Sequence, residues 1–272
     1  MPSLKLSARL GVVVAVALAA SAAVGAAPSG PTVISAIDLA GPFAARSAWR
    51  FTASQGPSVA DPDGSAGDEV PGDVRLCLRK AASGACDPQL LGTLSAASTD
   101  DSFSQPHYLN DAKIVEGAPG HPLLLVQTAS LHSGDGDQLV FTQALAYRRE
   151  TDEFVRVYDH QTGRNNNQEV RYVEKGPLKG DIISAEPTEN APFGFWVVVN
   201  TLTPGRAYKE VLRYRSATRY GDGNPLSVID SEMANIEQRL GLWRPGAPLP
   251  LPTRTPCLAP HLIHMELWCA GG

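Results

Sequence analysis

The sequence lacks the local motifs of the commonest enzyme mechanisms. It contains no GxSxG nucleophile elbow, no HExxH zinc motif, no GxGxxG dinucleotide-binding turn and no P-loop. These absences count against the usual serine hydrolases, zinc proteases and nucleotide-binding enzymes. Because many active sites have no local signature, they do not decide whether the protein is an enzyme.

The sequence also lacks a long apolar run after its first 26 residues, and a membrane span needs about 20 such residues. We therefore expect no span in the rest of the chain. Within residues 1–26, Lys5 and Arg9 precede an apolar run that ends near Val24, where small residues follow. This order predicts a secretory signal peptide. An uncleaved anchor is the alternative, whereas a lipoprotein anchor is excluded because the first cysteine is Cys77.

An excess of positive charge is missing as well. Cleavage after residue 26 would remove two of the 23 basic residues and none of the 28 acidic ones, so the net charge would fall from −5 to −7. Nucleic acids and anionic lipids require clustered Lys and Arg, so neither is an expected partner. The signal and the Ala-, Gly- and Pro-rich composition predict a periplasmic or secreted bacterial protein with an unknown envelope or extracellular ligand.

Cysteine is scarce, with four residues in the chain. In an oxidising export compartment, four cysteines predict two disulfides. The nearest pairs are Cys77 with Cys86 and Cys257 with Cys269, and each bond would contribute about 2–3 kcal/mol. Crossed pairing stays open. A zinc site is the rival interpretation, but the cysteines lack the CxxC spacing that is typical of one.

Composition divides the chain after the signal peptide into three segments. Residues 27–73 hold short strands and a loop rich in Gly, Pro and Asp over 56–73. Residues 74–243 form the main β domain with its terminal helix, although 83–119 has little pattern and is expected to be irregular. Residues 244–272 form a Pro-rich connector and a C-terminal tail that a disulfide holds in place.

Short runs rich in Val, Ile, Tyr and Phe, separated by turn residues, predict strands. The predicted strands are Thr32–Ile37, Trp49–Ala53, Val74–Leu78, Leu123–Thr128, Leu139–Tyr147, Phe154–Tyr158, Val170–Val173, Ile182–Ala185, Phe195–Leu202, Tyr208–Tyr214 and Leu226–Ile229. They predict a mainly β fold, an antiparallel sandwich or barrel-like meander with one C-terminal helix and loop-rich flanks.

The hexapeptide YRRETD from Tyr147 to Asp152 predicts one hairpin turn. Asp152 suits the left-handed residue that closes a type I turn, because Asp tolerates that conformation.

A helix is predicted near the C-terminus of the main domain. Asp230 or Ser231 is the candidate cap, apolar residues recur at helical spacing from Met233 to Leu240, and Gly241 suits the left-handed stop.

Two Gly-Asp-Gly turns are candidate metal sites. One contains Asp135 and Asp137, the other contains Asp222 and Asn224, and their side-chain oxygens suit Ca²⁺. Neither turn has the Glu that an EF-hand loop places at its twelfth position. Because Asp-Gly is also the best short-turn signal, we favour plain hairpin turns, and no other cofactor is predicted.

His261 and His264, with Glu266 nearby, are a second candidate metal cluster, because residues three apart share a face of a helix. The sequence has no glutamate beside the first histidine and supplies no evident third ligand. We favour a pair of surface histidines.

Acid–base candidates lie in the middle of the chain. Asp159 and His160 precede a polar run that contains Arg164 and Asn166, and Glu186 follows a predicted strand. A base beside amide and Arg donors suits a sugar or a carboxylate ligand.

Arg213 and Arg215 alternate along a predicted strand and therefore share one face. Together with Arg164 and Asn166 they are the ligand-binding candidates. The alternative for all of these residues is a solvated polar surface with cross-strand ion pairs.

These observations favour a non-catalytic, disulfide-stabilised binding or structural protein of the bacterial envelope. One alternative is a secreted hydrolase of glycans or peptides that uses Asp159, His160 and Glu186. The other is a Ca²⁺-dependent scaffold.

Overall fold

The computed structural model describes residues 30–64, 67–81, 83–87, 103, 105–134, 137–163, 168–188, 194–205, 207–219, 221–251 and 257–269. The predicted signal peptide over residues 1–26 lies outside these ranges. Among the candidate site residues, Asp135, Arg164 and Asn166 also lie outside them.

The described chain is mainly β, as predicted, and three of its antiparallel sheets follow one another in sequence. The first sheet contains β1 (Thr32–Asp38), β2 (Arg50–Gln55) and β5 (Val74–Arg79). The second contains β6 (Tyr108–Ala118), β7 (His121–Ala129), β8 (Val140–Arg148) and β9 (Glu153–Thr162). The third contains β10 (Glu169–Tyr172), β11 (Ile182–Pro187), β12 (Phe195–Leu202) and β13 (Tyr208–Arg215). None of these described sheets closes into a barrel, so the barrel-like alternative is wrong.

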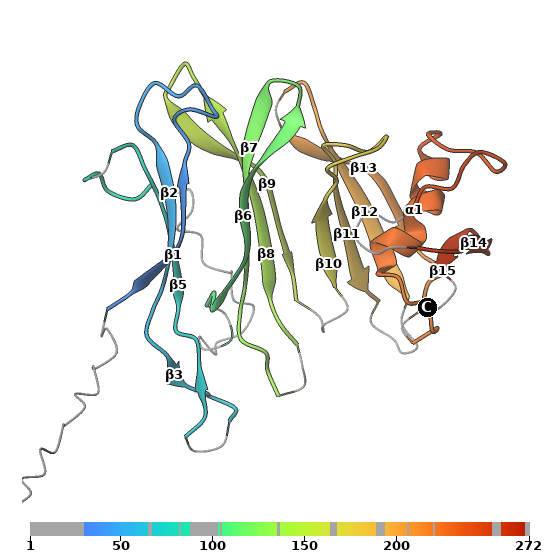
Figure 1. Cartoon of the computed structure of the whole chain (residues 1–272), viewed down its shortest axis with the longest axis horizontal. Helices are drawn as coiled ribbons and strands as arrows, with labels where there is room; N and C mark the ends of the chain where they lie inside the picture. The colour runs from blue at the N-terminus through green and yellow to red at the C-terminus, as the bar shows by residue number, and fades with distance from the viewer. Residues whose placement is uncertain are drawn as a thin grey trace, which may run out of the picture.

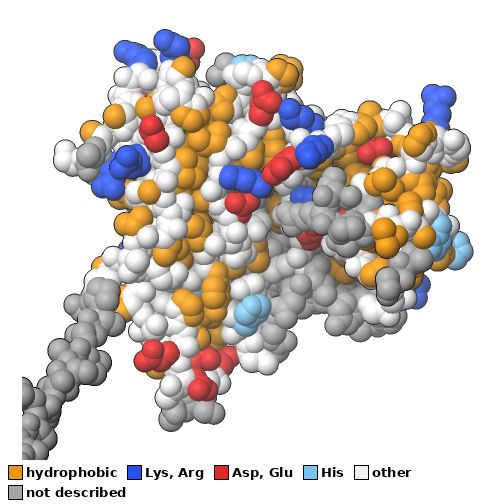
Figure 2. Space-filling model, in the orientation of Figure 1, with side chains coloured by type: hydrophobic (Ala, Val, Ile, Leu, Met, Phe, Trp, Pro, Cys, Tyr) orange, Lys and Arg blue, Asp and Glu red, His pale blue; other side chains and the backbone are white. Residues whose placement is uncertain are grey.

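The three sheets stack face to face, and the helix α1 (Val228–Arg239) covers the outer face of the third (Figure 1). A last hairpin of β14 (Pro260–Ile263) and β15 (Glu266–Cys269) packs on the far side of α1. On the face shown in Figure 2, hydrophobic side chains gather in bands that run along the strands of the first two sheets. The molecule is therefore a stack of layers held by several separate cores.

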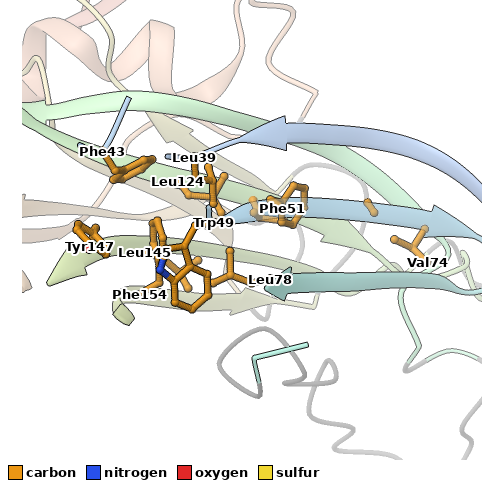
Figure 3. Packing of buried hydrophobic residues seen from close by; sticks show 12 residues of the cluster. Leu39, Phe43, Trp49, Phe51, Val74, Leu78, Leu124, Leu145, Tyr147 and Phe154 are labelled. Atoms are coloured by element: carbon orange, nitrogen blue, oxygen red, sulfur yellow. The ribbon is translucent and has the colours of Figure 1, made fainter. Parts of the chain in front are cut away.

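Aromatic side chains fill the core between the first and second sheets. The ring of Phe154 lies 4.9 Å from that of Phe43 and 5.3 Å from that of Trp49, both edge-on. Figure 3 shows these side chains and Leu124 pointing toward one another. Edge-on aromatic pairs contribute about 0.5–1.5 kcal/mol beyond the area they bury.

The second sheet is buried on both faces. For this reason the sequence of its strand β7 is continuously apolar. Successive side chains of a strand point to opposite faces. Leu124 and Val126 enter the core with the first sheet, whereas Leu123 and Leu125 enter the core with the third. The gap between the second and third sheets is thus an interior of the protein.

The helix begins earlier than predicted, which makes the predicted strand Leu226–Ile229 wrong. The N-cap is Ser227, not Asp230 or Ser231, and its side chain makes no cap bond. Instead, the Ile229 backbone N–H donates to a carboxylate oxygen of Glu169 on β10, at 3.2 Å. The cap therefore comes from a strand of the third sheet, some 60 residues away. At the other end, Gly241 has a φ of 74° and ends the helix as predicted.

Two segments predicted to lack structure contain strands. The eleven residues of β6 lie within 83–119, and a short hairpin of β3 (Val59–Ala60) and β4 (Glu69–Val70) lies within the predicted loop 56–73. In β6 most side chains are half-buried at the sheet edge, and two register shifts interrupt the alternation that marks a strand.

The turn after β8 has the predicted conformation. Asp152 closes it with a φ of 53°. Its carboxylate accepts hydrogen bonds from Ser47 Oγ at 2.5 Å, Trp49 Nε1 at 3.0 Å and Tyr147 Oη at 2.8 Å. One turn residue thereby joins the first sheet to the second.

Both predicted disulfides are confirmed. Cys77 is bonded to Cys86 and Cys257 to Cys269, which overturns the crossed pairing and the zinc site. The helix found in the described residues is too short and too polar to cross a bilayer.

Candidate functional site

A cavity of about 210 Å³ lies between the second and third sheets. Polar side chains line most of it, although the rest of this gap is apolar. The lining residues come from β9 and from β11, β12 and β13: Val157, Tyr158, Asp159, His160, Ser184, Val198, Asn200, Tyr208, Glu210 and Arg213. Tyr158 and His160 alternate along β9, as Ser184 and Glu186 do along β11, so each pair shares a face.

Two of the acid–base candidates are in contact beside this cavity, which His160 lines. Nε2 of His160 lies 2.7 Å from Oε1 of Glu186, and both side chains are about one-third exposed. A carboxylate only accepts hydrogen bonds, so Nε2 carries the proton. Asp159 lines the same cavity and accepts a hydrogen bond from Arg156 at 3.3 Å. The fold thus brings His160 and Glu186 into contact, and Asp159 lines the cavity that His160 also lines.

Arg213 also lies at the cavity, where it donates to both carboxylate oxygens of Glu210 at 2.7–3.0 Å. These hydrogen bonds raise the pKa of Arg213, and the charges of Glu210 and Glu186 raise it further. A register shift between β12 and β13 turns Glu210 and Arg213 to the same side. Arg215 pairs with Trp196 in the ladder and does not line the cavity.

Two of the lining residues carry buried hydroxyls that are not predicted from the sequence. Tyr158 is 8% exposed and Ser184 is 1% exposed, and neither hydroxyl oxygen has a hydrogen-bond partner among the described residues. Burial raises the pKa of Tyr158, as do the charges of Glu186 and Asp159, so its phenol stays neutral. One signal in the sequence could have indicated Ser184. It follows Ile182 by two residues, so a polar side chain stands on a strand face that is otherwise apolar.

In the second Gly-Asp-Gly turn, the side-chain oxygens already accept hydrogen bonds from nearby backbone N–H groups. Asp222 accepts from the Asn224 backbone N–H at 2.8 Å, and Asn224 accepts from the Leu226 backbone N–H at 3.1 Å. Across the described ranges, no group of three or more His, Cys, Asp or Glu side chains could hold a metal ion. Calcium binding by the first turn, with Asp135 and Asp137, stays a prediction.

The candidate histidine cluster is not on a helix. His261 lies on β14, and His264 lies in the tight turn before β15 with a φ of 50°. Glu266 lies on β15 and is 7% exposed. Burial raises its pKa to about 7, as do the charges of Glu232 and Asp222. Glu266 therefore lies near the carboxyl groups of Glu232 and Asp222, where the hairpin packs against the helix.

Comparisons with protein-family models, with curated proteins and with solved structures found no match for this chain.

Proposed function

We propose that this protein is an exported binding protein that holds a small polar ligand between its second and third sheets. The observation that carries the proposal is the cavity of about 210 Å³ between these sheets, which polar side chains line although the rest of the gap is apolar. The side chains of Asn200, Glu210 and Arg213 line this cavity and offer a ligand both hydrogen-bond donors and acceptors.

The same geometry favours binding over hydrolysis. A serine nucleophile needs its base within hydrogen-bond reach, and Ser184 makes no hydrogen bond to His160. The hydrolase remains the second candidate because the His160–Glu186 hydrogen bond resembles a base held by an acid. It predicts that Glu186→Gln abolishes hydrolysis of a glycan or peptide substrate while binding persists.

Export is supported by the two disulfides, because such bonds persist in oxidising compartments. Producing the full chain in a bacterium and weighing the product by mass spectrometry tests this part. We expect the chain outside the cytoplasm, with both disulfides formed and its N-terminus after Ala26. An intact N-terminus on a cytoplasmic chain would contradict export.

A thermal-melt screen tests the binding function directly. The oxidised protein is heated with neutral sugars, amino acids or small carboxylic acids in turn, because a ligand that binds only the native state raises Tm. A hit is accepted only if Asn200→Ala, at the cavity wall, abolishes its shift and Tyr147→Phe, outside the cavity, leaves the shift unchanged. If no compound of the three classes gives such a shift, the binding function is contradicted.

A further inference from the structure

We infer that the C-terminal hairpin, residues 257–269, is a pH-sensitive switch that docks on α1 in acid and is released as the pH rises. The hairpin lies outside the cavity between the second and third sheets, so the switch does not depend on the proposed binding function. Three features support it: the weak attachment of the hairpin, a pair of buried acids at its contact with α1, and the disulfide that closes it.

Side chains attach the hairpin to the rest of the protein. Among the described strands, β14 and β15 pair only with each other, so no backbone ladder joins them to the third sheet. Leu267 packs in a small core with Leu226, and the Asn224 side-chain amide donates to the Leu267 backbone oxygen at 2.9 Å. Segments with few buried apolar contacts open at low free energy, and this hairpin has the features of one.

Two acidic side chains lie near each other where the hairpin packs against the helix. Glu266 on β15 is 7% exposed, and Glu232 on α1 is fully buried. The oxygens of Glu232 accept hydrogen bonds from three neutral donors: Tyr214 Oη at 2.7 Å, Thr218 Oγ1 at 2.7 Å and Asn235 Nδ2 at 2.9 Å. These donors suit an ionised acid, which only accepts hydrogen bonds. A second negative charge on Glu266 would therefore be repelled inside this contact.

The other groups that face Glu266 supply no positive charge. They are Asp222, in the turn before α1, and Tyr214 on β13. Arg239 on α1 lies over the ring of Tyr214, at 4.3 Å from its centroid, and makes no ion pair with a described acid. A buried charge without a cation is unfavourable, whereas release of the hairpin returns Glu266 to water.

The ionisation of Glu266 falls in the range where the switch would act. Burial, and then the charges of Glu232 and Asp222, raise its pKa to about 7 from 4.5. The docked state thus favours the protonated acid, so docking is strongest below pH 4.5 and weakens as the pH rises through 7. A difference of about 2.5 pKa units corresponds to a docking constant that falls by up to about 300-fold.

The Cys257–Cys269 disulfide would keep the released hairpin in one piece, because it joins the two ends of the segment. The connector that precedes it, residues 244–256, contains five prolines. Proline-rich segments are extended and have no internal hydrogen bonds, which suits a tether. The hairpin can therefore leave as a unit and uncover the side of α1 that it contacts.

Hydrogen exchange of the oxidised protein between pH 5 and pH 8.5 tests the switch, with each rate divided by the intrinsic rate of that amide at the same pH. We expect the protection of residues 257–269 to fall about tenfold or more over this range. Protection in β7 and β8 should stay constant. Glu266→Gln cannot ionise at this position and should keep the hairpin protected throughout. Glu116→Gln, an exposed acid on β6, is the matched control and should behave as wild type.

A second variant weakens docking without changing the acids. Asn224→Ala removes the hydrogen bond to the Leu267 backbone, so release should begin at a lower pH. A loss of protection that persists in Glu266→Gln would assign the pH dependence to other groups, such as His261 and His264, and would overturn the switch. Constant protection of the hairpin up to pH 8.5, or an equal loss in β7 and β8, would overturn it as well.

Discussion

At the residue scale, the buried hydroxyl of Tyr158 lowers the stability of the folded protein, because it has no hydrogen-bond partner among the described residues. Tyr158→Phe removes the unpartnered oxygen and keeps the ring, so we expect the free energy of unfolding without ligand to stay equal or rise by about 1 kcal/mol. Tyr147→Phe is the matched control, because Tyr147 Oη donates to Asp152 and accepts from the Arg46 backbone N–H. That variant should lose about 1–2 kcal/mol in urea unfolding. Equal losses in the two variants would mean that Tyr158 has a partner after all.

We expect the Asp152 carboxylate to make the free energy of unfolding depend on pH. Burial alone would raise its pKa, but hydrogen bonds from Ser47, Trp49 and Tyr147 and the charge of Lys80 together lower it. Since the folded-state pKa is below the ordinary value of 3.8, the stabilisation is complete above that value and is lost as the pH falls below it. Asp152→Asn keeps a residue that tolerates the left-handed backbone. The variant should lose roughly 2 kcal/mol at pH 7 and progressively less below pH 4. A pH-independent difference in urea unfolding would contradict this.

At the scale of single elements, the start of α1 depends on one buried guanidinium. Arg171 on β10 bonds to Asp230 in the first turn of the helix and to Glu169, which caps it. The side chains of Arg171 and Asp230 are 3% and 1% exposed. Arg171→Met would leave two carboxylates buried without a cation, which costs about 3–5 kcal/mol. The control is Lys179→Ala, whose ion pair with Glu116 is half-exposed and therefore contributes little to stability. Similar losses in urea unfolding would show that the Arg171 cluster is solvated.

We expect Glu266 in the C-terminal hairpin to give the free energy of unfolding the opposite pH dependence. Glu266 has a folded-state pKa of about 7 against an ordinary value of 4.5, so its ionisation destabilises the folded state. The stability is present below pH 4.5 and is lost as the pH rises through 7. Glu266→Gln removes the charge and should be more stable than wild type by up to about 3 kcal/mol at pH 8, with little difference at pH 4. Urea unfolding at the two pH values measures this, and an equal effect at both would refute it.

The strands that could be predicted were those with a clear burial pattern. The predicted Phe195–Leu202 matches β12, and the continuous apolar run Leu123–Thr128 falls within β7. In contrast, β6 could not be predicted, because its edge position leaves Asp111 and Lys113 within the strand. The β-branched pair Val228–Ile229 indicated a strand locally, but packing against the third sheet makes it the first turn of α1.

The site could be predicted only in part. His160 and Glu186 were candidates by residue type, yet they are 26 residues apart and lie on strands of different sheets. Their contact follows from the stacking of sheets, which no local pattern encodes. Ser184 was not predicted at all, because a single serine in an apolar strand has no distinguishing spacing.

At the scale of the whole molecule, the Cys257–Cys269 disulfide holds a peripheral layer. The bond closes a 12-residue separation around β14 and β15, whose own core is small. Replacing both cysteines with serine should cost about 2–3 kcal/mol, confined to this hairpin. Hydrogen exchange should then speed up in residues 257–269 and stay unchanged in β7 and β8. Faster exchange throughout the stack would show that the hairpin supports the entire fold.

The order of the layers also determines how the molecule responds to a pulling force. The described chain enters at the first sheet and leaves beyond α1, at opposite ends of the stack (Figure 1). A pull on its two ends acts along the stack, across faces that meet through side chains, while backbone hydrogen bonds run within each sheet. Under load the layers would separate one at a time, each yielding at low force and releasing its strands as a discrete step in length.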